Sequence, residues 1–174
     1  NYIMNVASLD YNLSEQQLVD CDTNNHGCGG GWYRNAINYF LTNFMIKEDD
    51  YKYTAAAGTC QYTSKQHTTI KTTGYKYTYD ADLNYESLGL GPVAAAVDAN
   101  DSFYSYSSGV WSAACGDAVN HAMTVVGYSS ADSAWIIRNS WGTAWGEQGH
   151  MRLKEDYNNH NSCWIARYGY RPNF

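Results

Sequence analysis

The chain lacks the features of a membrane-spanning or nucleic-acid-binding protein. No apolar run approaches the roughly 20 residues that are needed to cross a bilayer. Basic residues are few: 11 Lys and Arg stand against 17 Asp and Glu, for a net charge of −6, and the basic residues form no cluster. Nucleic acids and anionic membranes attract basic surfaces, so this balance argues against both partners. We predict no membrane span and no nucleic-acid partner.

The start of the chain also lacks a signal segment. Asn1 does not open the charged and then apolar stretch that directs secretion. Translated chains begin with Met, whereas this one begins with Asn-Tyr-Ile-Met-Asn, as if partway through an element. We therefore expect a processed or truncated start, with a segment missing upstream.

The cysteines are odd in number and lack the spacing of a metal site. Cys21 and Cys28 are separated by six residues, and no pair of histidines completes a zinc pattern. We expect no metal and no cofactor. Two glycosylation sequons, Asn12-Leu13-Ser14 and Asn100-Asp101-Ser102, are compatible with secretion, although such triplets also occur by chance. The five cysteines are Cys21, Cys28, Cys60, Cys115 and Cys163.

Helical patterns dominate the first part of the chain. With 44% apolar residues among 174, the chain can bury a core as one domain or as two small lobes. Ser14 and Gln17 have the spacing of a capping box, which predicts a short helix from that point. A second helix is predicted over 32–44, after a loop of three glycines at 29–31, because apolar residues recur there at helical spacing.

Beyond Gly74 the pattern changes to that of strands. Tyrosines alternate with polar residues over 75–79, and short β-type runs follow at 93–97, 123–126 and 135–137. The tyrosines are more simply a strand surface than a platform for stacking bases. Helices and strands segregated along the chain indicate the α+β class. We predict a helical lobe over 1–73 and a β-rich lobe over 74–174.

Three segments carry the chemistry. The first joins Leu13-Ser14-Glu15-Gln16-Gln17-Leu18-Val19-Asp20-Cys21-Asp22 to Gly27-Cys28-Gly29-Gly30-Gly31, the second is Asn120-His121-Ala122, and the third is Arg138-Asn139-Ser140-Trp141-Gly142-Thr143-Ala144-Trp145-Gly146-Glu147. In this order and spacing the chain resembles the papain-like cysteine peptidases of the cathepsin L type over essentially its whole length. The resemblance implies a two-lobe fold with an incomplete helical lobe, a β-barrel-like lobe and an active-site cleft between them.

The chemistry of thiol peptidases suits His121, Asn139 and Trp141. Acyl transfer by a thiol needs a thiolate, which a neighbouring imidazolium stabilises before it protonates the departing amine. His121 suits that role, and the amide oxygen of Asn139 can orient its ring. By resemblance, Trp141 covers the hydrogen bond between them and excludes water. Taken singly, the histidine could end a strand, the asparagine could lie in a turn and the tryptophan could belong to the core.

Substrate contacts follow from the same resemblance. Gly30 and Gly31 match a glycine strip that pairs with the backbone of an extended peptide, although a plain turn is the simpler alternative. If Tyr168 closes the floor of the specificity pocket, the preferred substrate residue is apolar. The other positions matched to substrate binding are Trp32, Tyr33, Ala96, Asn120 and Ala122.

The nucleophilic cysteine of the family is absent from its expected place. The family places it in a Cys-Gly-Ser-Cys-Trp type signature roughly 130–150 residues before the histidine and asparagine. That spacing puts the nucleophile about ten residues before Asn1. The lost stretch would also carry the glutamine of the oxyanion hole. The resemblance further pairs Cys21 with Cys60 and Cys115 with Cys163, and it leaves Cys28 without its partner.

These features lead to two functional hypotheses. In the first, the chain is the heavy chain or a fragment of a cysteine endopeptidase, inactive alone and joined through Cys28 to a segment or light chain with the nucleophile. In the second, it is a catalytically inactive relative that acts as a structural or interaction module. Trp164, where the family usually has glycine, and the absent nucleophile motivate the second. A free Cys28 is a further alternative. We favour the endopeptidase, acting on peptides in a lysosome or vacuole or after secretion.

Overall fold

The computed structural model describes residues 11–79, 88–158 and 160–174. The chain divides into two compact units, Asn1–Lys76 with Pro172–Phe174 and Tyr77–Arg171. No helix among the described residues is long and apolar enough to cross a membrane. The helices are α2 (Glu15–Cys21), η1 (Gly27–Gly29), α3 (Tyr33–Thr42), η2 (Tyr62–Ser64), α4 (Leu88–Leu90), α5 (Asp101–Tyr104) and α6 (His160–Cys163).

Helix α2 begins where the capping pattern predicted. The Ser14 hydroxyl accepts a hydrogen bond from the Gln17 N–H at 3.0 Å, which satisfies a free donor of the first turn. The reciprocal hydrogen bond of a capping box, from the Ser14 N–H to the Gln17 side chain, does not form. Gln17 is fully buried, and its side chain accepts from the Ile46 N–H at 2.8 Å and donates to the Phe44 carbonyl at 2.9 Å. A buried amide therefore joins α2 to the segment that follows α3.

Helix α3 is shorter than the apolar pattern predicted. It begins at Tyr33 with Trp32 as its N-cap, and Asn43 ends it in an extended conformation, donating its side-chain amide to the Tyr39 carbonyl at 2.9 Å. Ile37 is the buried apolar residue of the helix, whereas Phe44 lies beyond its end and is 37% exposed. Polar Asn43 thus stops the helix although the apolar periodicity continues.

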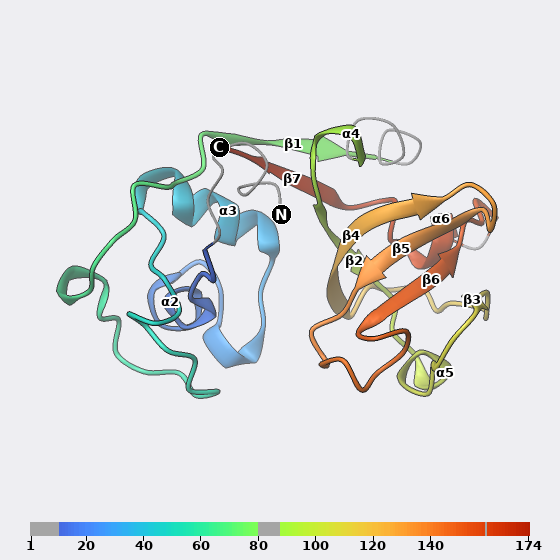
Figure 1. Ribbon diagram of the computed structural model, residues 1–174, viewed down its shortest axis with the longest axis horizontal. Helices are drawn as coiled ribbons and strands as arrows, with labels where there is room; N and C mark the ends of the chain where they lie inside the picture. The colour runs from blue at the N-terminus through green and yellow to red at the C-terminus, as the bar shows by residue number, and fades with distance from the viewer. Residues whose placement is uncertain (1–10, 80–87, 159) are drawn as a thin grey trace. The chain divides into compact units, whose positions relative to one another are not determined.

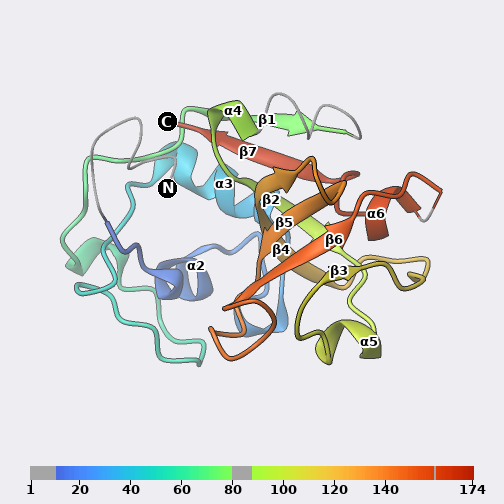
Figure 2. The same cartoon turned by 45° about the vertical axis from the view of Figure 1, so that its right-hand side comes forward.

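The strands form one mixed seven-stranded sheet in the order β1-β7-β2-β4-β5-β6-β3. Strands β2, β4, β5 and β6 pair antiparallel, while β3 pairs parallel to β6. Figures 1 and 2 both show β4, β5 and β6 side by side. The strands are β1 (Gly74–Thr78), β2 (Val93–Val97), β3 (Val110–Trp111), β4 (His121–Ser129), β5 (Ala134–Arg138), β6 (His150–Lys154) and β7 (Gly169–Asn173).

The main hydrophobic core lies against one face of this sheet. Alternate residues of β2, β4, β5 and β6 point into it, as the two-residue period of a strand requires. Phe103 of α5 and Ile165 close the core, and both are fully buried. The strands expected from 75–79, 93–97, 123–126 and 135–137 are present as β1, β2, β4 and β5. The core strand residues include Val93, Ala95, Val97, Met123, Val125, Trp135, Ile137, Met151 and Leu153.

Candidate active site

His121 is the first residue of β4, and its backbone position is fixed by the end of β2. It lies opposite Val97 in the antiparallel register. The preceding residue, Asn120, donates its N–H to the Val97 carbonyl at 3.1 Å, and its side chain accepts from the Ala99 N–H at 2.8 Å. The same amide also donates to the Ala99 carbonyl at 3.1 Å. The Asn120 side chain thus anchors the start of β4, so its amide is already engaged within the fold.

Asn139 meets the imidazole of His121 at the end of β5. The two residues are eighteen positions apart, and the His121 Nε2 lies 3.0 Å from the Asn139 Oδ1. An amide oxygen can only accept, so the ring carries its proton on Nε2. Nδ1 is then the basic nitrogen, and no described residue forms a hydrogen bond with it. Asn139 is 7% exposed, and its N–H donates to the Gly149 carbonyl at 2.9 Å.

An aromatic cluster surrounds this hydrogen bond. The Trp141 ring lies 4.8 Å from that of His121, and Tyr104 stacks on Trp141 at 4.9 Å with an interplanar angle of 10°. Beneath them, Phe103 packs edge-on against both His121 and Trp141 at 6.4 and 6.1 Å. The Trp145 indole donates to the Tyr104 carbonyl at 3.2 Å. The cluster covers one side of the histidine with apolar surface, which excludes water and strengthens hydrogen bonds beneath it.

Phe103 and Tyr104 are site residues that the motifs did not indicate. Phe103 reaches the histidine and Tyr104 reaches the neighbouring Trp141 because Asn100 caps α5, accepting from the N–H groups of Ser102 and Phe103 at 3.1 and 3.3 Å. Asn100 followed by Asp101 is a helix-start signal in the sequence. This signal could have located α5, but it does not reveal that α5 packs against His121 and Trp141.

We expect Tyr104→Ala to loosen the cover over the His121–Asn139 hydrogen bond. Tyr104 is 58% exposed, so its removal leaves little cavity but exposes one face of Trp141 to water. An aromatic pair contributes about 0.5–1.5 kcal/mol, so the His121 Nε2 proton should exchange with water roughly 2- to 10-fold faster. Imidazole proton NMR measures this rate. Tyr104→Phe keeps the stacking and should behave as the wild type, and equal exchange in both variants would contradict the role of the ring.

The loop after Asn139 is held by Gly146 and by the ion pairs of Arg152. Gly146 has a φ of +56°, and a Cβ there would lie 2.5 Å from the His150 carbonyl oxygen, so only glycine fits. Glu147 then accepts two hydrogen bonds from Arg152, at 2.7 and 3.0 Å, and one from the Gly109 N–H at 2.9 Å. Arg152 also contacts Asp132 at 3.0 Å. The second tryptophan of the Asn-Ser-Trp-Gly motif therefore lies in a turn fastened to β6.

The stability contributed by Glu147 should depend on pH. Hydrogen bonds from Arg152, the largest cause, and from Gly109 lower the pKa of the Glu147 carboxyl below its usual 4.5, against a partial opposing effect of burial. A lowered folded-state pKa stabilises the fold above the unfolded-state pKa, and this contribution disappears as the pH falls through the lower value. Glu147→Gln should thus cost about 1–2 kcal/mol at pH 7 and progressively less below pH 4.5.

Chemical denaturation of the wild type and of Glu147→Gln at pH 7 and pH 3 measures this difference. The exposed carboxylate Asp49 supplies a matched control, because Asp49→Asn should change stability little at either pH. A Glu147→Gln penalty of the same size at both pH values would contradict the assignment.

Trp164 occupies a backbone conformation that glycine favours. Its φ is +73°, and Ser162 and Cys163 before it also have positive φ, at +57° and +58°. The ring is accommodated outside the core: its indole N–H donates to the Gly116 carbonyl at 3.0 Å, and the Arg167 guanidinium lies 4.8 Å from the ring centre. The tryptophan in place of glycine therefore affects only its immediate surroundings.

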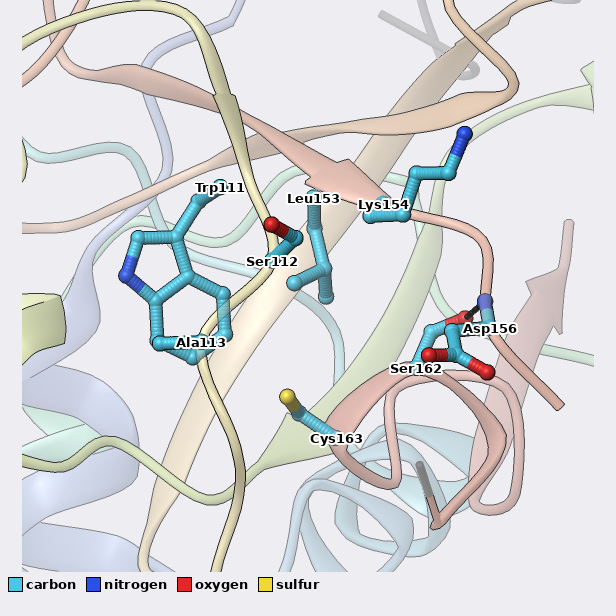
Figure 3. Close-up of a pocket in the computed structure, with 8 residues that line it drawn as sticks. All are labelled: Trp111, Ser112, Ala113, Leu153, Lys154, Asp156, Ser162 and Cys163. Carbon is cyan, nitrogen blue, oxygen red and sulfur yellow. Dashed lines mark hydrogen bonds between the residues drawn. The ribbon is translucent and has the colours of Figure 1, made fainter. Parts of the chain in front are cut away.

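A disulfide braces the same region. Cys115 and Cys163 are bonded, with their Cα atoms 5.3 Å apart. Figure 3 shows Cys163 in a small pocket beside Ala113 and Leu153, with Ser162 accepting from the Asp156 N–H at 2.8 Å. The Asp98 N–H donates to the Cys163 carbonyl at 3.2 Å, which connects the bridge to the residue after β2.

The residues matched to a specificity pocket are partly brought together. Ala96 and Ala122 are cross-strand neighbours in β2 and β4. Because side chains alternate along a strand, they point to the face opposite that of His121. Ala96 is 4% exposed, while Ala122 is exposed. Tyr168 is half-buried, and the Arg167 guanidinium lies 5.7 Å from its ring centre.

The glycine strip lies in the first unit, between η1 and α3. Gly30 has a φ of +98°, which favours glycine. A Cβ on Gly31 would lie 2.3 Å from the Asn25 side chain, which accepts from the Trp32 N–H at 2.8 Å. Asn25 thus shapes the strip, a role that no sequence motif revealed. No described residue forms a hydrogen bond with the N–H or the carbonyl of Gly31, so both remain open to a ligand.

An open, mostly apolar groove of about 330 Å³ adjoins the strip. Leu18 and Val19 of α2 and Ala36 of α3 line it, together with Trp32 (48% exposed) and Tyr33. In the same unit, Cys21 is bonded to Cys60, and Cys28 of η1 is a free, exposed thiol. The structure thus contains the two disulfides that the resemblance implied. No group of metal-ligating side chains occurs among the described residues.

Comparison with known proteins identifies the family. The model of the papain family cysteine proteases matches residues 1–172. Macrodontain-1 from Ananas macrodontes is 38% identical over 170 residues, covering 95% of this chain and 78% of that protein. Cathepsin L 1 from Paramecium tetraurelia is 45% identical over 145 residues, covering 82% of this chain and 45% of that protein. Fruit bromelain from Ananas comosus is 38% identical over 161 residues, covering 88% of this chain and 45% of that protein.

Solved structures agree with this result. Bromelain from Ananas comosus, in complex with the inhibitor E64, superposes with a TM-score of 0.90 at 32% identity, covering 99% of this chain and 83% of that one. The Carica candamarcensis protease CMS1MS2, in complex with E-64, superposes with a TM-score of 0.91 at 28% identity, covering 98% of this chain and 81% of that one. The chain belongs to the papain family of cysteine proteases, and the predicted papain-like α+β fold is confirmed. It spans about half the length of several of its curated relatives.

Proposed function

We propose that this chain supplies the histidine and asparagine of a cysteine endopeptidase. The observation that carries the proposal is the 3.0 Å hydrogen bond between the His121 Nε2 and the Asn139 Oδ1, covered by Trp141. This contact holds the ring in one orientation and keeps the proton on Nε2, so that Nδ1 is left as the base. Membership of the papain family supports the reaction class.

In the proposed reaction, His121 moves protons and a thiol forms the covalent bond. The imidazole takes the thiol proton, and the resulting imidazolium stabilises the thiolate. The thiolate attacks the peptide carbonyl, the C–N bond breaks, and His121 protonates the departing amine. Water, deprotonated by the same nitrogen, then hydrolyses the thioester. Asn139 remains neutral and orients the ring throughout, so it adds no second negative charge beside the thiolate.

We propose that the nucleophile comes from a segment or light chain outside these 174 residues. Four of the five cysteines are bridged, which leaves Cys28 as the free thiol. Cys28 would then bond to that segment, and the apolar groove lined by Leu18 and Val19 would receive it. This chain alone is expected to be inactive.

The substrate class proposed is an extended peptide with an apolar side chain next to the cut. The free N–H and carbonyl of Gly31 can pair with a peptide backbone, as in strand addition. From the family resemblance we propose that Trp32, Tyr33, Ala96, Asn120, Ala122 and Tyr168 contribute to substrate binding. Two disulfides favour an oxidising compartment, and we propose a lysosome or vacuole, or secretion.

The test compares the native protein before and after reduction. If the nucleophile lies on a separate chain, reduction should release a smaller fragment that was bound through Cys28. If it lies on the same chain, the mass should reveal one longer chain that includes these residues and a Cys-Trp segment. That complete protein hydrolyses a peptide with an apolar residue before the cut, and the 174-residue chain alone does not. An upstream sequence with Ser or Gly at the nucleophile position, or a complete protein without hydrolysis, would overturn the proposal and leave an inactive binding module.

A further inference from the structure

The two glycosylation sequons of the chain have different surroundings in the fold. Asn12-Leu13-Ser14 leads into α2, and Asn100-Asp101-Ser102 forms the start of α5. An N-linked glycan is large and hydrated, so its asparagine must keep its side-chain nitrogen in solvent once the protein has folded. The distinction between the two sites therefore depends on what each side-chain amide does in the structure.

The Asn12 amide is open. The residue is exposed, and its side chain forms no hydrogen bond with a described residue. Its backbone is nonetheless fixed, because the Asn12 carbonyl accepts from the Glu48 N–H at 2.9 Å and Leu13 bridges Lys47. The hydroxyl group of the sequon, on Ser14, points inward, where it caps α2 and donates to the Tyr51 carbonyl at 2.5 Å. A glycan on Asn12 leaves both of these contacts in place. A sugar on Asn12 would project into solvent without displacing any of these contacts.

The Asn100 amide is occupied at both ends. Its oxygen accepts from the Ser102 N–H, the Ser102 hydroxyl and the Phe103 N–H, at 3.1, 2.7 and 3.3 Å. Its nitrogen, the atom that would carry a sugar, donates to the Ala114 carbonyl at 2.9 Å. A sugar would replace one of the two hydrogens on that nitrogen, beside the Ala114 carbonyl that accepts the other. It would disturb the cap that places Phe103 and Tyr104 beside Trp141.

We propose that Asn12 is an N-glycosylation site of this protein and that Asn100 is not. The inference rests on the oxidising, secretory compartment of the proposed function. In the transfer, the Asn12 amide nitrogen forms a bond to the anomeric carbon of a lipid-diphosphate oligosaccharide. The bond from that carbon to the diphosphate oxygen breaks, and the lipid diphosphate leaves with the electron pair. The amide gives up one proton to a base of the transferase.

The modification defines a face of the first unit. A glycan on Asn12 keeps the edge formed by Leu13 and Lys47 in solvent in the mature protein. Any segment or partner that docks on this unit must then use another surface, and the groove at Val19, Trp32 and Ala36 fits that requirement.

The experiment uses the complete protein, secreted by a eukaryotic host and shown by mass to contain both disulfides. Enzymatic removal of N-glycans in H₂¹⁸O marks each formerly modified asparagine. We expect the label on Asn12 and none on Asn100. Asn12→Gln should abolish the glycan, with unchanged secretion, and the matched variant Asn100→Gln should retain it. An unmodified Asn12 in the secreted, disulfide-bonded protein, or a glycan on Asn100, would overturn the inference while leaving the proposed compartment and peptidase activity intact.

Discussion

His121→Ala in the complete protein is expected to lower kcat/KM for a fluorogenic peptide by about 10³-fold or more. Proton transfer by a positioned base contributes about 10²–10⁴-fold to rate, and the same imidazole also stabilises the thiolate. Because the change removes the group that activates the nucleophile, the loss should fall mainly on kcat. Steady-state kinetics of purified, folded variants measures it.

Two further variants make this result specific. Asn139→Ala removes the hydrogen bond that orients the ring and should give a smaller loss in kcat/KM. His67→Ala removes an exposed histidine that stacks on Tyr62 and should leave kcat/KM unchanged. Retention of more than a tenth of wild-type activity in His121→Ala would contradict its role as the base.

The second large effect is on stability. Phe103→Ala should lower the free energy of unfolding by about 3–5 kcal/mol, because Phe103 is fully buried and truncating a buried phenylalanine leaves a cavity. For a chain of this size, the loss corresponds to a fall in Tm of about 10 °C. The same ring supports His121, Trp111 and Trp145 at 6.4, 5.5 and 5.7 Å. Activity below Tm should therefore also decrease.

Thermal and chemical denaturation measure this change. Leu90→Ala, which truncates a side chain that is 52% exposed, is the matched control and should shift Tm by little. A Phe103→Ala variant as stable as this control would show that Phe103 is not part of the core. Retained activity in a destabilised Phe103→Ala variant would show that the ring supports the fold but not the histidine.

The sequence predicted those parts of the fold that depend on local pattern. The N-cap of α2, the strands β2, β4 and β5, and the motif that places His121 and Asn139 are all readable from neighbouring residues. Strands β3, β6 and β7 were not predicted. β3 has only two residues, and β7 includes a proline, so neither carries a clear alternating pattern. Such strands are determined by their partners in the sheet.

Long-range polar contacts were the least predictable part of the site. Gln17 matches a capping box, yet its side chain crosses to the segment 44–46 and is fully buried there. Asn25 shapes the strip beside Gly31, and Asn120 fixes the start of β4. Each of these amides satisfies backbone groups that lie far away or outside regular structure, and no periodicity marks such a residue in advance.

The central claim is that His121 and Asn139 serve a thiol that lies outside the five cysteines of this chain. Its most direct measurement is the mass-spectrometric location of a thiol-directed peptide epoxide on the native, complete protein. We expect a single adduct on a cysteine outside residues 1–174, lost in His121→Ala, with Cys28 unlabelled in its disulfide. An adduct on Cys28, or hydrolysis of peptides by a protein that the epoxide does not label, would contradict it.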